Sequence, residues 1–361
     1  MAVEISKLQS DIFSILKAIA IIAVVAGHTL YEPVSDFVYL FHLPLFYFCS
    51  GYLFKDKYAD AKWTFVKNRF KRLYVPTLLY GLFFLSIYNL LFDINVYNQH
   101  FGYLDSVSHR FVLSDYISAL KQLLICNPGA CGSMLGAMWF VRSILICSIA
   151  FCFLVFISKK LSPSRSDLVL GILVFSVAIL FNWVPFEWYK MPLKPNIARE
   201  MACGVPLMYF GRLFRYVKTE RFDKWFLLIG LFCFIVLVAV SFVGYDNSVG
   251  DGWHQTSLLL HYVVSLIGIL FAYVCATYIV KTPLVTPLKV VGKYTFEIMA
   301  LHFIAFKLVS LVQIYIYNYD DTYLSKFPVI EINSHIWWIP YTIVGVGLPL
   351  FYVWLKNMKK L

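Results

Sequence analysis

Charged residues are scarce in this sequence. Asp, Glu, Lys and Arg make up 14% of its 361 residues, whereas a soluble domain carries about 25%. No polar stretch is long enough to fold by itself, and hydrophobic residues make up 60% of the chain. Together these features exclude an ordinary soluble core and predict one bundle of membrane-spanning helices. The 33 Phe and 25 Tyr residues suit the aromatic belts of such helices.

Several functional motifs are also absent from the sequence. It contains no glycine-rich phosphate loop, no cluster of metal ligands and no nucleophile elbow, so we expect no metal cofactor. No repeat or linker divides it, which predicts a single transmembrane domain over residues 1–361 with no appended soluble domain. The net charge of +11 resides in short loops between apolar runs. This pattern indicates membrane orientation rather than a nucleic-acid partner.

Ten apolar runs approach the length of about 20 residues that a membrane span requires. They are residues 12–30, 38–54, 74–92, 138–157, 168–184, 197–214, 225–244, 258–280, 294–317 and 337–355. The expected fold is therefore all-α, with about ten transmembrane helices. With a cytoplasmic N-terminus, 22 of the Lys and Arg residues fall on the cytoplasmic side and 6 fall outside. This bias predicts that both termini are cytoplasmic.

Two of the eight cysteines, Cys126 and Cys131, lie in a polar loop that this topology places outside. An outside location allows a disulfide between them. Their short spacing does not establish the geometry that such a bond requires. A disulfide and two free thiols are both compatible with the sequence.

The first apolar run contains two ionisable residues, Lys17 and His28. They are eleven residues apart, which places both on one stripe of a helix, separated by about 16 Å along its axis. Ionisable groups inside a membrane are costly and usually face a partner or a cavity. The alternative is structural: Lys17 extends to the cytoplasmic surface and His28 lies at the outer interface.

The second apolar run favours a functional role for His28. It contains His42, and a connection of only seven residues would bring the two imidazoles to a similar depth in a hairpin. Imidazoles can accept a proton from a hydroxyl group near neutral pH. Ser50 and the neighbouring Gly51 are small enough to let a ligand or a helix approach. Ser50 lies about two turns inward of His42, which argues against a role as nucleophile.

The order of these residues follows a larger pattern. Lys17 and His28 form a basic residue, ten residues and then a histidine, and residues 41–54 read Phe-His-Leu-Pro-Leu-Phe-Tyr-Phe-Cys-Ser-Gly-Tyr-Leu-Phe. Later segments follow in order: Arg69 and Arg72 ahead of Leu73 and Pro76, Trp139-Phe140-Val141-Arg142, Gly292-Lys293-Tyr294, and Leu301-His302. This combination resembles the membrane-bound acyltransferase family 3, and in particular its fucose 4-O-acetylase-like branch. Many members have Asp at the position of Ser14 and Arg at the position of Lys17.

The resemblance implies an enzyme of the bacterial inner membrane. Such enzymes transfer an acyl group, usually acetyl from acetyl-CoA, to a hydroxyl of a cell-surface glycan or lipid-linked sugar. The essential histidine of the family falls on His28, and its arginine motif falls on Arg69 and Arg72. We expect Lys17, Arg69 and Arg72 to contact acyl-CoA. For the two arginines, ordinary cytoplasmic charge is the alternative to a phosphate clamp.

Further ionisable residues lie in the later runs. Arg142 either contacts the acceptor or acyl carbonyl, or forms a structural ion pair with a carboxylate such as Glu200. Glu297 and His302 are five residues apart and do not share a helical face, so each is either an acceptor contact or a polar packing residue. Lys307 has no evident partner. Two other functions remain open: a glycan or metabolite transporter, which paired broken helices would favour, and a non-catalytic membrane assembly protein.

Overall fold

The computed structural model describes residues 6–103, 106–183, 196–247, 249 and 257–358. The chain forms two compact units, each assembled from three segments. The first unit contains Met1–Ala20, Asp36–Lys71 and Ser143–Lys293, and the second contains Ile21–Ser35, Arg72–Arg142 and Tyr294–Leu361. We describe each unit by itself. The predicted all-α class is confirmed, because helices make up both units apart from one pair of two-residue strands.

The first unit is built from long helices joined by short helical turns. Its elements are α1 (Lys7–Gly27), α2 (Glu32–Tyr39), α3 (His42–Tyr52), α4 (Asp56–Asp60), α5 (Lys62–Arg69), the π-helix η1 (Phe70–Tyr74), α9 (Trp139–Leu161), η4 (Pro163–Arg165), α10 (Ser166–Trp183), α11 (Asn196–Phe214), η6 (Thr219–Trp225), α12 (Phe226–Phe242), α13 (Leu258–Ile279) and α14 (Val285–Lys293). Four of these elements, α1, α2, η1 and α9, begin in one unit and end in the other.

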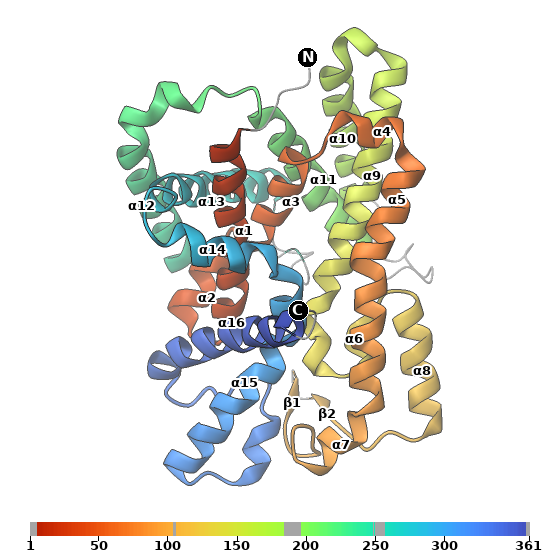
Figure 1. The fold of residues 1–361 in the computed structure, drawn as a ribbon, viewed down its shortest axis with the longest axis vertical. Coiled ribbons are helices and arrows are strands. Elements are labelled where there is room, and N and C mark those ends of the chain that lie inside the picture. The colour runs from red at the N-terminus through yellow and green to blue at the C-terminus, as the bar shows by residue number, and fades with distance from the viewer. Residues whose placement is uncertain (1–5, 104–105, 184–195, 248, 250–256, 359–361) are drawn as a thin grey trace. The chain divides into compact units, whose positions relative to one another are not determined.

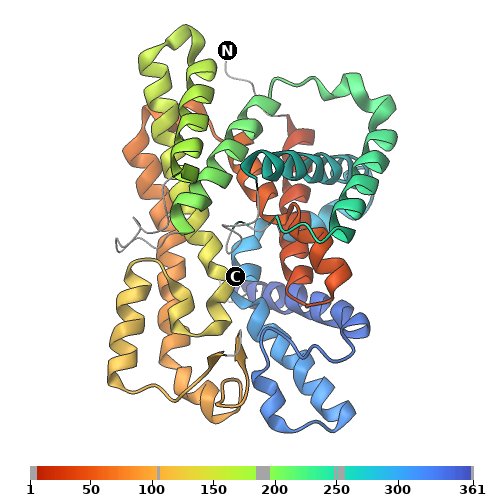
Figure 2. The same cartoon turned by 180° about the vertical axis from the view of Figure 1, so that it is seen from behind.

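Glycines allow α3 and α11 to touch along their backbones. A Cβ added at Gly51 would fall 1.8 Å from the carbonyl oxygen of Met208, and one added at Gly211 would fall 2.1 Å from the carbonyl oxygen of Phe48. Small residues at such crossings let two helices approach closely. On its other side α11 contacts α10, and the two lie alongside each other in Figure 1 and, from behind, in Figure 2.

The second unit is organised around α15 (Thr295–Tyr317), whose residues are largely buried. Its other elements are α6 (Val75–Ser86), α7 (Tyr88–Asp93), β1 (Gly102–Tyr103), β2 (Ser106–Val107), α8 (Leu113–Leu124), η2 (Pro128–Cys131), η3 (Ser133–Met138), η7 (Asp321–Ser325) and α16 (Ser334–Met358). Strands β1 and β2 pair antiparallel. Helix α15 contacts α16, η3 and η7, and Figure 1 shows α15 and α16 in blue beside each other.

Seven helical segments of the described chain are long and apolar enough to cross a membrane. They are Lys7–Gly27, Ser133–Leu161, Pro163–Asn182, Thr219–Phe242, Leu258–Ile279, Thr295–Tyr317 and Ser334–Met358. Each corresponds to one of the ten predicted runs. The count of about ten spans is therefore not confirmed by length and composition, while the orientation of the termini stays a prediction.

The three remaining predicted runs do not form long apolar helices, and each has a local reason. The run 38–54 gives only the 11-residue helix α3, because α2 occupies the connection that we predicted to be a short loop. The run 74–92 is divided at Ile87 into α6 and α7. Helix α11 has 19 residues, but three of them are charged: Arg199, Glu200 and Arg212. Arg212 donates to Asp56 and Asp167 at 2.6 and 2.7 Å.

Candidate active site

Two histidines from opposite ends of the sequence form a side-chain pair in the second unit. His28 directly follows the last residue of α1, and His302 lies two turns into α15. The Nδ1 atom of His28 lies 3.1 Å from the Nε2 atom of His302. The two rings are nearly parallel, at an interplanar angle of 16°. The distance identifies a hydrogen bond between the imidazoles.

The surroundings of His302 determine where the protons of this pair lie. Its Nδ1 atom lies 3.1 Å from the carbonyl oxygen of Ile298 and 3.0 Å from that of Met299. Carbonyl oxygens only accept hydrogen bonds, so Nδ1 of a neutral His302 carries the proton and Nε2 accepts. His28 must then donate from its own Nδ1. This tautomer leaves Nε2 of His28 as the unprotonated nitrogen, which is the state required of a general base.

Aromatic rings surround the buried side of the pair. Phe303 contacts both imidazoles, with its ring centroid 4.1 Å from His302 and 4.9 Å from His28. The ring of Phe306 lies against His302, and that of Phe327 lies against Phe303. His302 is completely buried, whereas His28 is only half-buried. His28 is therefore the member of the pair that a substrate can reach.

Local hydrogen bonds end α1 next to His28. The hydroxyl of Thr29 donates to the carbonyl oxygen of Ala26 at 2.6 Å, and the hydroxyl of Ser35 donates to that of Gly27 at 2.9 Å. The last carbonyls of a helix lack partners within the helix, and here side chains supply them. Leu30 has a left-handed backbone, with φ of 56°, which turns the chain away after the histidine. His28 is thus carried on a well-defined helix end.

A comparison with known families identifies the family of the chain. Residues 11–354 match the family model for the acyltransferase domain of acyltransferase family 3. The chain belongs to this family. The match covers nearly the whole chain and includes both histidines, and the apolar helices fit a membrane acyltransferase. Comparisons with curated proteins and with solved structures give no match.

Three other predicted site residues of this acyltransferase lie in the second unit. Arg142 is buried near the start of α9. Glu297 is half-buried in the first turn of α15. Arg72 is exposed in the π-helix η1, an uncommon element that often occurs at functional sites. Glu200, the carboxylate we considered for Arg142, belongs to the first unit.

The remaining predicted residues of the acyltransferase lie in the first unit. The Nδ1 atom of His42 lies 2.9 Å from the carbonyl oxygen of Val38, four residues earlier. Ser50 is half-buried in α3. Arg69 ends α5 with its guanidinium 5.1 Å from the centre of the Phe65 ring. Among the predicted site residues, His28 and His302 contact each other directly. The others are located here by the helix that carries them and by their burial.

Lys17 lies on α1 beside residues that contact α14. A Cβ added at Gly292 would fall 2.0 Å from the carbonyl oxygen of Ser14, so only glycine allows this approach. Asp11 and Lys289 form an ion pair across the same two helices at 2.6 Å. Lys17 is half-buried beside this contact. The glycine of the family motif Gly-Lys-Tyr therefore has a packing role next to a proposed donor-binding residue.

The structure answers two questions that the sequence left open. Cys131 is a free and completely buried thiol, so the possible disulfide with Cys126 is not formed. Lys307, which had no evident partner, donates to the carbonyl oxygen of Lys326 at 2.6 Å. The sequence also gave no sign that His302 pairs with His28. The available signals were that His302 is an ionisable residue in a predicted span and that Leu301-His302 belongs to the family pattern.

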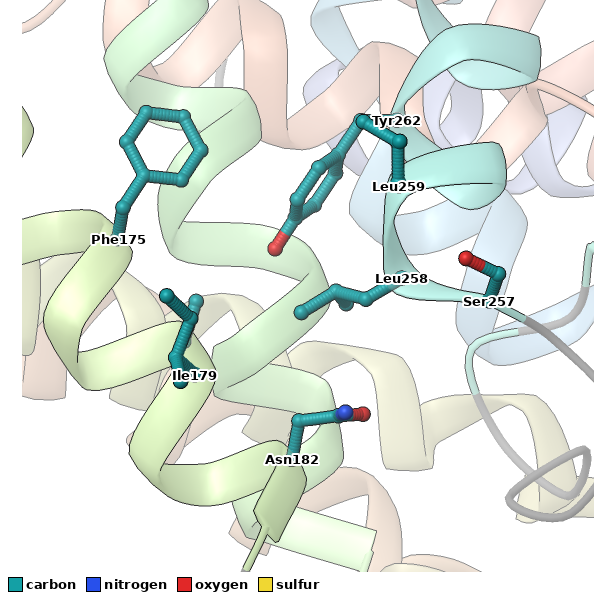
Figure 3. A pocket seen from close by; sticks show the side chains of 8 residues that line it. Phe175, Ile179, Asn182, Ser257, Leu258, Leu259 and Tyr262 are labelled. Atoms are coloured by element: carbon teal, nitrogen blue, oxygen red, sulfur yellow. The ribbon is translucent and has the colours of Figure 1, made fainter.

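A pocket of about 410 Å³ lies in the first unit, between α10 and α13. Figure 3 shows Phe175 and Ile179 on the α10 side, and Leu258 and Tyr262 on the α13 side. The hydroxyl of Tyr262 donates to the carbonyl oxygen of Ala202 at 2.6 Å. The described lining is mainly apolar, and no histidine or carboxylate is among its residues. These lining residues therefore do not suggest an acid–base site.

Proposed function

We propose that this acyltransferase moves an acetyl group from acetyl-CoA to a hydroxyl of a cell-surface glycan or lipid-linked sugar in the bacterial inner membrane. The single observation that carries the proposal is the hydrogen bond from His28 to His302, which leaves Nε2 of His28 unprotonated. An acyl transfer to a sugar needs a base for the hydroxyl proton. The family resemblance, closest to the fucose 4-O-acetylase-like branch, supplies the donor and acceptor classes.

The proposed reaction proceeds from this nitrogen. Nε2 of His28 takes the proton of the sugar hydroxyl as the hydroxyl oxygen attacks the thioester carbonyl carbon. The new C–O bond forms, the C–S bond breaks, and the leaving thiolate of CoA takes the proton from the His28 imidazolium. The Nδ1–H of His28 remains bonded to His302 throughout, so the ring keeps its orientation as its charge changes. A transient acyl-His28 would use the same nitrogen as nucleophile.

The donor contacts are proposed on the basic residues Lys17, Arg69 and Arg72. Phosphate oxygens of CoA accept strong charge-assisted hydrogen bonds from such groups, and arginine can form two at once. Arg72 is exposed and Arg69 half-buried, so the protein covers neither residue completely. Lys289 is a poorer candidate, because Asp11 already occupies its ammonium group.

The acceptor or acyl contacts are proposed on Arg142, Glu297, His42 and Ser50, with His302 acting through His28. The supporting features are burial for Arg142 and His42 and the location of Glu297 on the helix that carries His302. An arginine can donate to several sugar oxygens in a fixed geometry. Surrounding lipids are the remaining expected partners.

Mass spectrometry of envelope glycans from cells with and without the gene tests the proposal. We expect a loss of about 42 daltons, the mass of one acetyl group, when the gene is removed. His28→Ala should reproduce that loss at an unchanged protein level, since a general base typically contributes about 10²–10⁴-fold in rate. Glycans of equal mass with and without the gene would exclude acetyl transfer. Equal masses combined with a changed glycan location would favour a transporter.

A further inference from the structure

Lys307 is an unusual residue in the middle of α15. It is 3% exposed, and α15 is one of the candidate membrane spans. Burying an ammonium group is expensive unless it is hydrogen-bonded. A neutral glutamine could supply a hydrogen bond to the carbonyl of Lys326 at lower cost. What lysine adds is a cation–π contact: its Nζ atom lies 5.8 Å from the centre of the Phe327 ring.

Lys307 is the first of three buried polar residues on neighbouring turns of α15, followed by Ser310 and Gln313. Lys307 and Gln313 hydrogen-bond residues 326–332, which we call the anchored segment, whereas Ser310 hydrogen-bonds Tyr341 at 2.9 Å. Gln313 donates to the carbonyl oxygen of Ile332 at 2.9 Å, and its side-chain oxygen accepts from the hydroxyl of Tyr341 at 2.8 Å. The same hydroxyl accepts from the backbone of Ile330 at 3.3 Å. The anchored segment is thus fixed at both of its ends.

The end held by Lys307 leads to Phe303, the ring that contacts both histidines. Lys307 holds the carbonyl of Lys326, and the next residue is Phe327, whose ring centroid lies 4.6 Å from that of Phe303. Phe303 in turn contacts both imidazoles. A Cβ added at Gly136 would lie 3.6 Å from Phe303 and 3.7 Å from Phe327, so η3 packs beside both rings.

We propose that Lys307 is a positioning residue that holds Phe327 against Phe303 and thereby fixes the orientation of the histidine pair. This inference rests on the proposed function. Loss of the Lys307 contacts frees the Phe327 ring, and Phe303 then has room to move away from both imidazoles. Catalysis depends on close placement, and a shift of about 1 Å can cost about 10²-fold in rate. Donor binding is proposed elsewhere, so KM for acetyl-CoA should change little.

A double-mutant cycle tests this route. Lys307→Met and Phe327→Leu would be made singly and together, and the release of CoA from acetyl-CoA followed in membranes that contain the natural acceptor. We expect each single variant to lower kcat by about 10–100-fold with KM unchanged. The double variant should be no slower than the slower single variant, because both changes remove the same support. Lys307→Arg keeps the donor and the cation and should recover part of the rate.

Gln313→Leu is the matched control. It removes the two hydrogen bonds that Gln313 forms with Ile332 and Tyr341 and leaves the contacts of Lys307, Phe327 and Phe303 in place. We expect its kcat to stay within about threefold of the wild-type value, even where its thermal stability in detergent falls. Independent, multiplying losses in Lys307→Met and Phe327→Leu would overturn the proposal. An equal loss of kcat in Gln313→Leu would also overturn it, since Lys307 would then only stabilise the fold.

A second measurement does not depend on the acyl donor. Purified protein labelled with ¹⁵N-histidine reports the tautomers of His28 and His302 by NMR, with His28→Ala used for assignment. We expect both rings of the wild type to be protonated at Nδ1, and Lys307→Met to mix the tautomers. Unchanged ring signals in Lys307→Met would overturn the proposal. If the wild type releases no CoA from acetyl-CoA, the proposed function fails, and the NMR result decides the role of Lys307.

Discussion

Replacement of His302 by phenylalanine tests the hydrogen-bond logic of the site. His302 contributes one acceptor atom, Nε2, to the Nδ1–H of His28. Phenylalanine has a similar shape and keeps the contacts with Phe303 and Phe306, but it offers no acceptor. The Nδ1–H of His28 is then left without its partner, and the alternative tautomer, with the proton on Nε2, becomes available. In that tautomer His28 cannot act as a base from Nε2.

The expected size of the effect follows from the cost of this lost bond. An unsatisfied buried donor costs about 1–3 kcal/mol, and each 1.36 kcal/mol corresponds to a factor of about ten in rate. His302→Phe should therefore lower kcat by about 5–150-fold, less than or equal to the loss in His28→Ala. His302→Gln restores an acceptor oxygen and should recover part of the activity. The assay is the initial rate of CoA release at saturating acetyl-CoA.

Two results would refute this reasoning. A His302→Phe variant with at least half of the wild-type kcat would show that the bond to His302 does not prepare His28. The variant that combines His28→Ala with His302→Phe provides the second test. Because His302 acts only through His28, this double variant should be no slower than His28→Ala. A further tenfold loss would assign His302 a separate role in the reaction.

Four further predictions concern other parts of the molecule. Arg69→Ala and Arg72→Ala should raise KM for acetyl-CoA, with partial rescue by lysine; an unchanged KM in both would leave these residues as topological charge. Gly292→Ala should destabilise the protein by about 1–3 kcal/mol in detergent melting, because its Cβ overlaps the backbone of α1, whereas Gly347→Ala, with open space around it, should be neutral. Burial raises the pKa of Cys131 to about 11, so the native thiol should alkylate slowly up to pH 9, and reduction should not increase labelling of the unfolded protein. A reporter fused to the C-terminus should be cytoplasmic, and an outside signal would contradict the charge bias.

The sequence alone determined the class of the protein. Apolar length and low charge are properties of each segment by itself, so they identified the all-α fold and the seven runs that give long apolar helices. The three other runs depended on where helices break. Ile87 interrupts the run 74–92 without a proline or glycine beside it. The run 38–54 is shortened by α2, and the prolines Pro33 and Pro44 lie in the first turns of α2 and α3.

For the candidate site, too, the sequence determined one part and the tertiary structure decided the other. The spacing of Lys17 and His28 placed both residues on one helical stripe, because residues eleven apart on one helix have a fixed relation. The family resemblance then led to the proposal that His28 is the catalytic histidine. The partners of His28 and Lys307 lie 274 and 19 residues away along the chain. No periodicity relates α1 to α15, since helix neighbours are chosen by packing over the whole unit. Only the tertiary structure could therefore place an acceptor nitrogen beside His28 and decide which of its two nitrogens is left to take a proton.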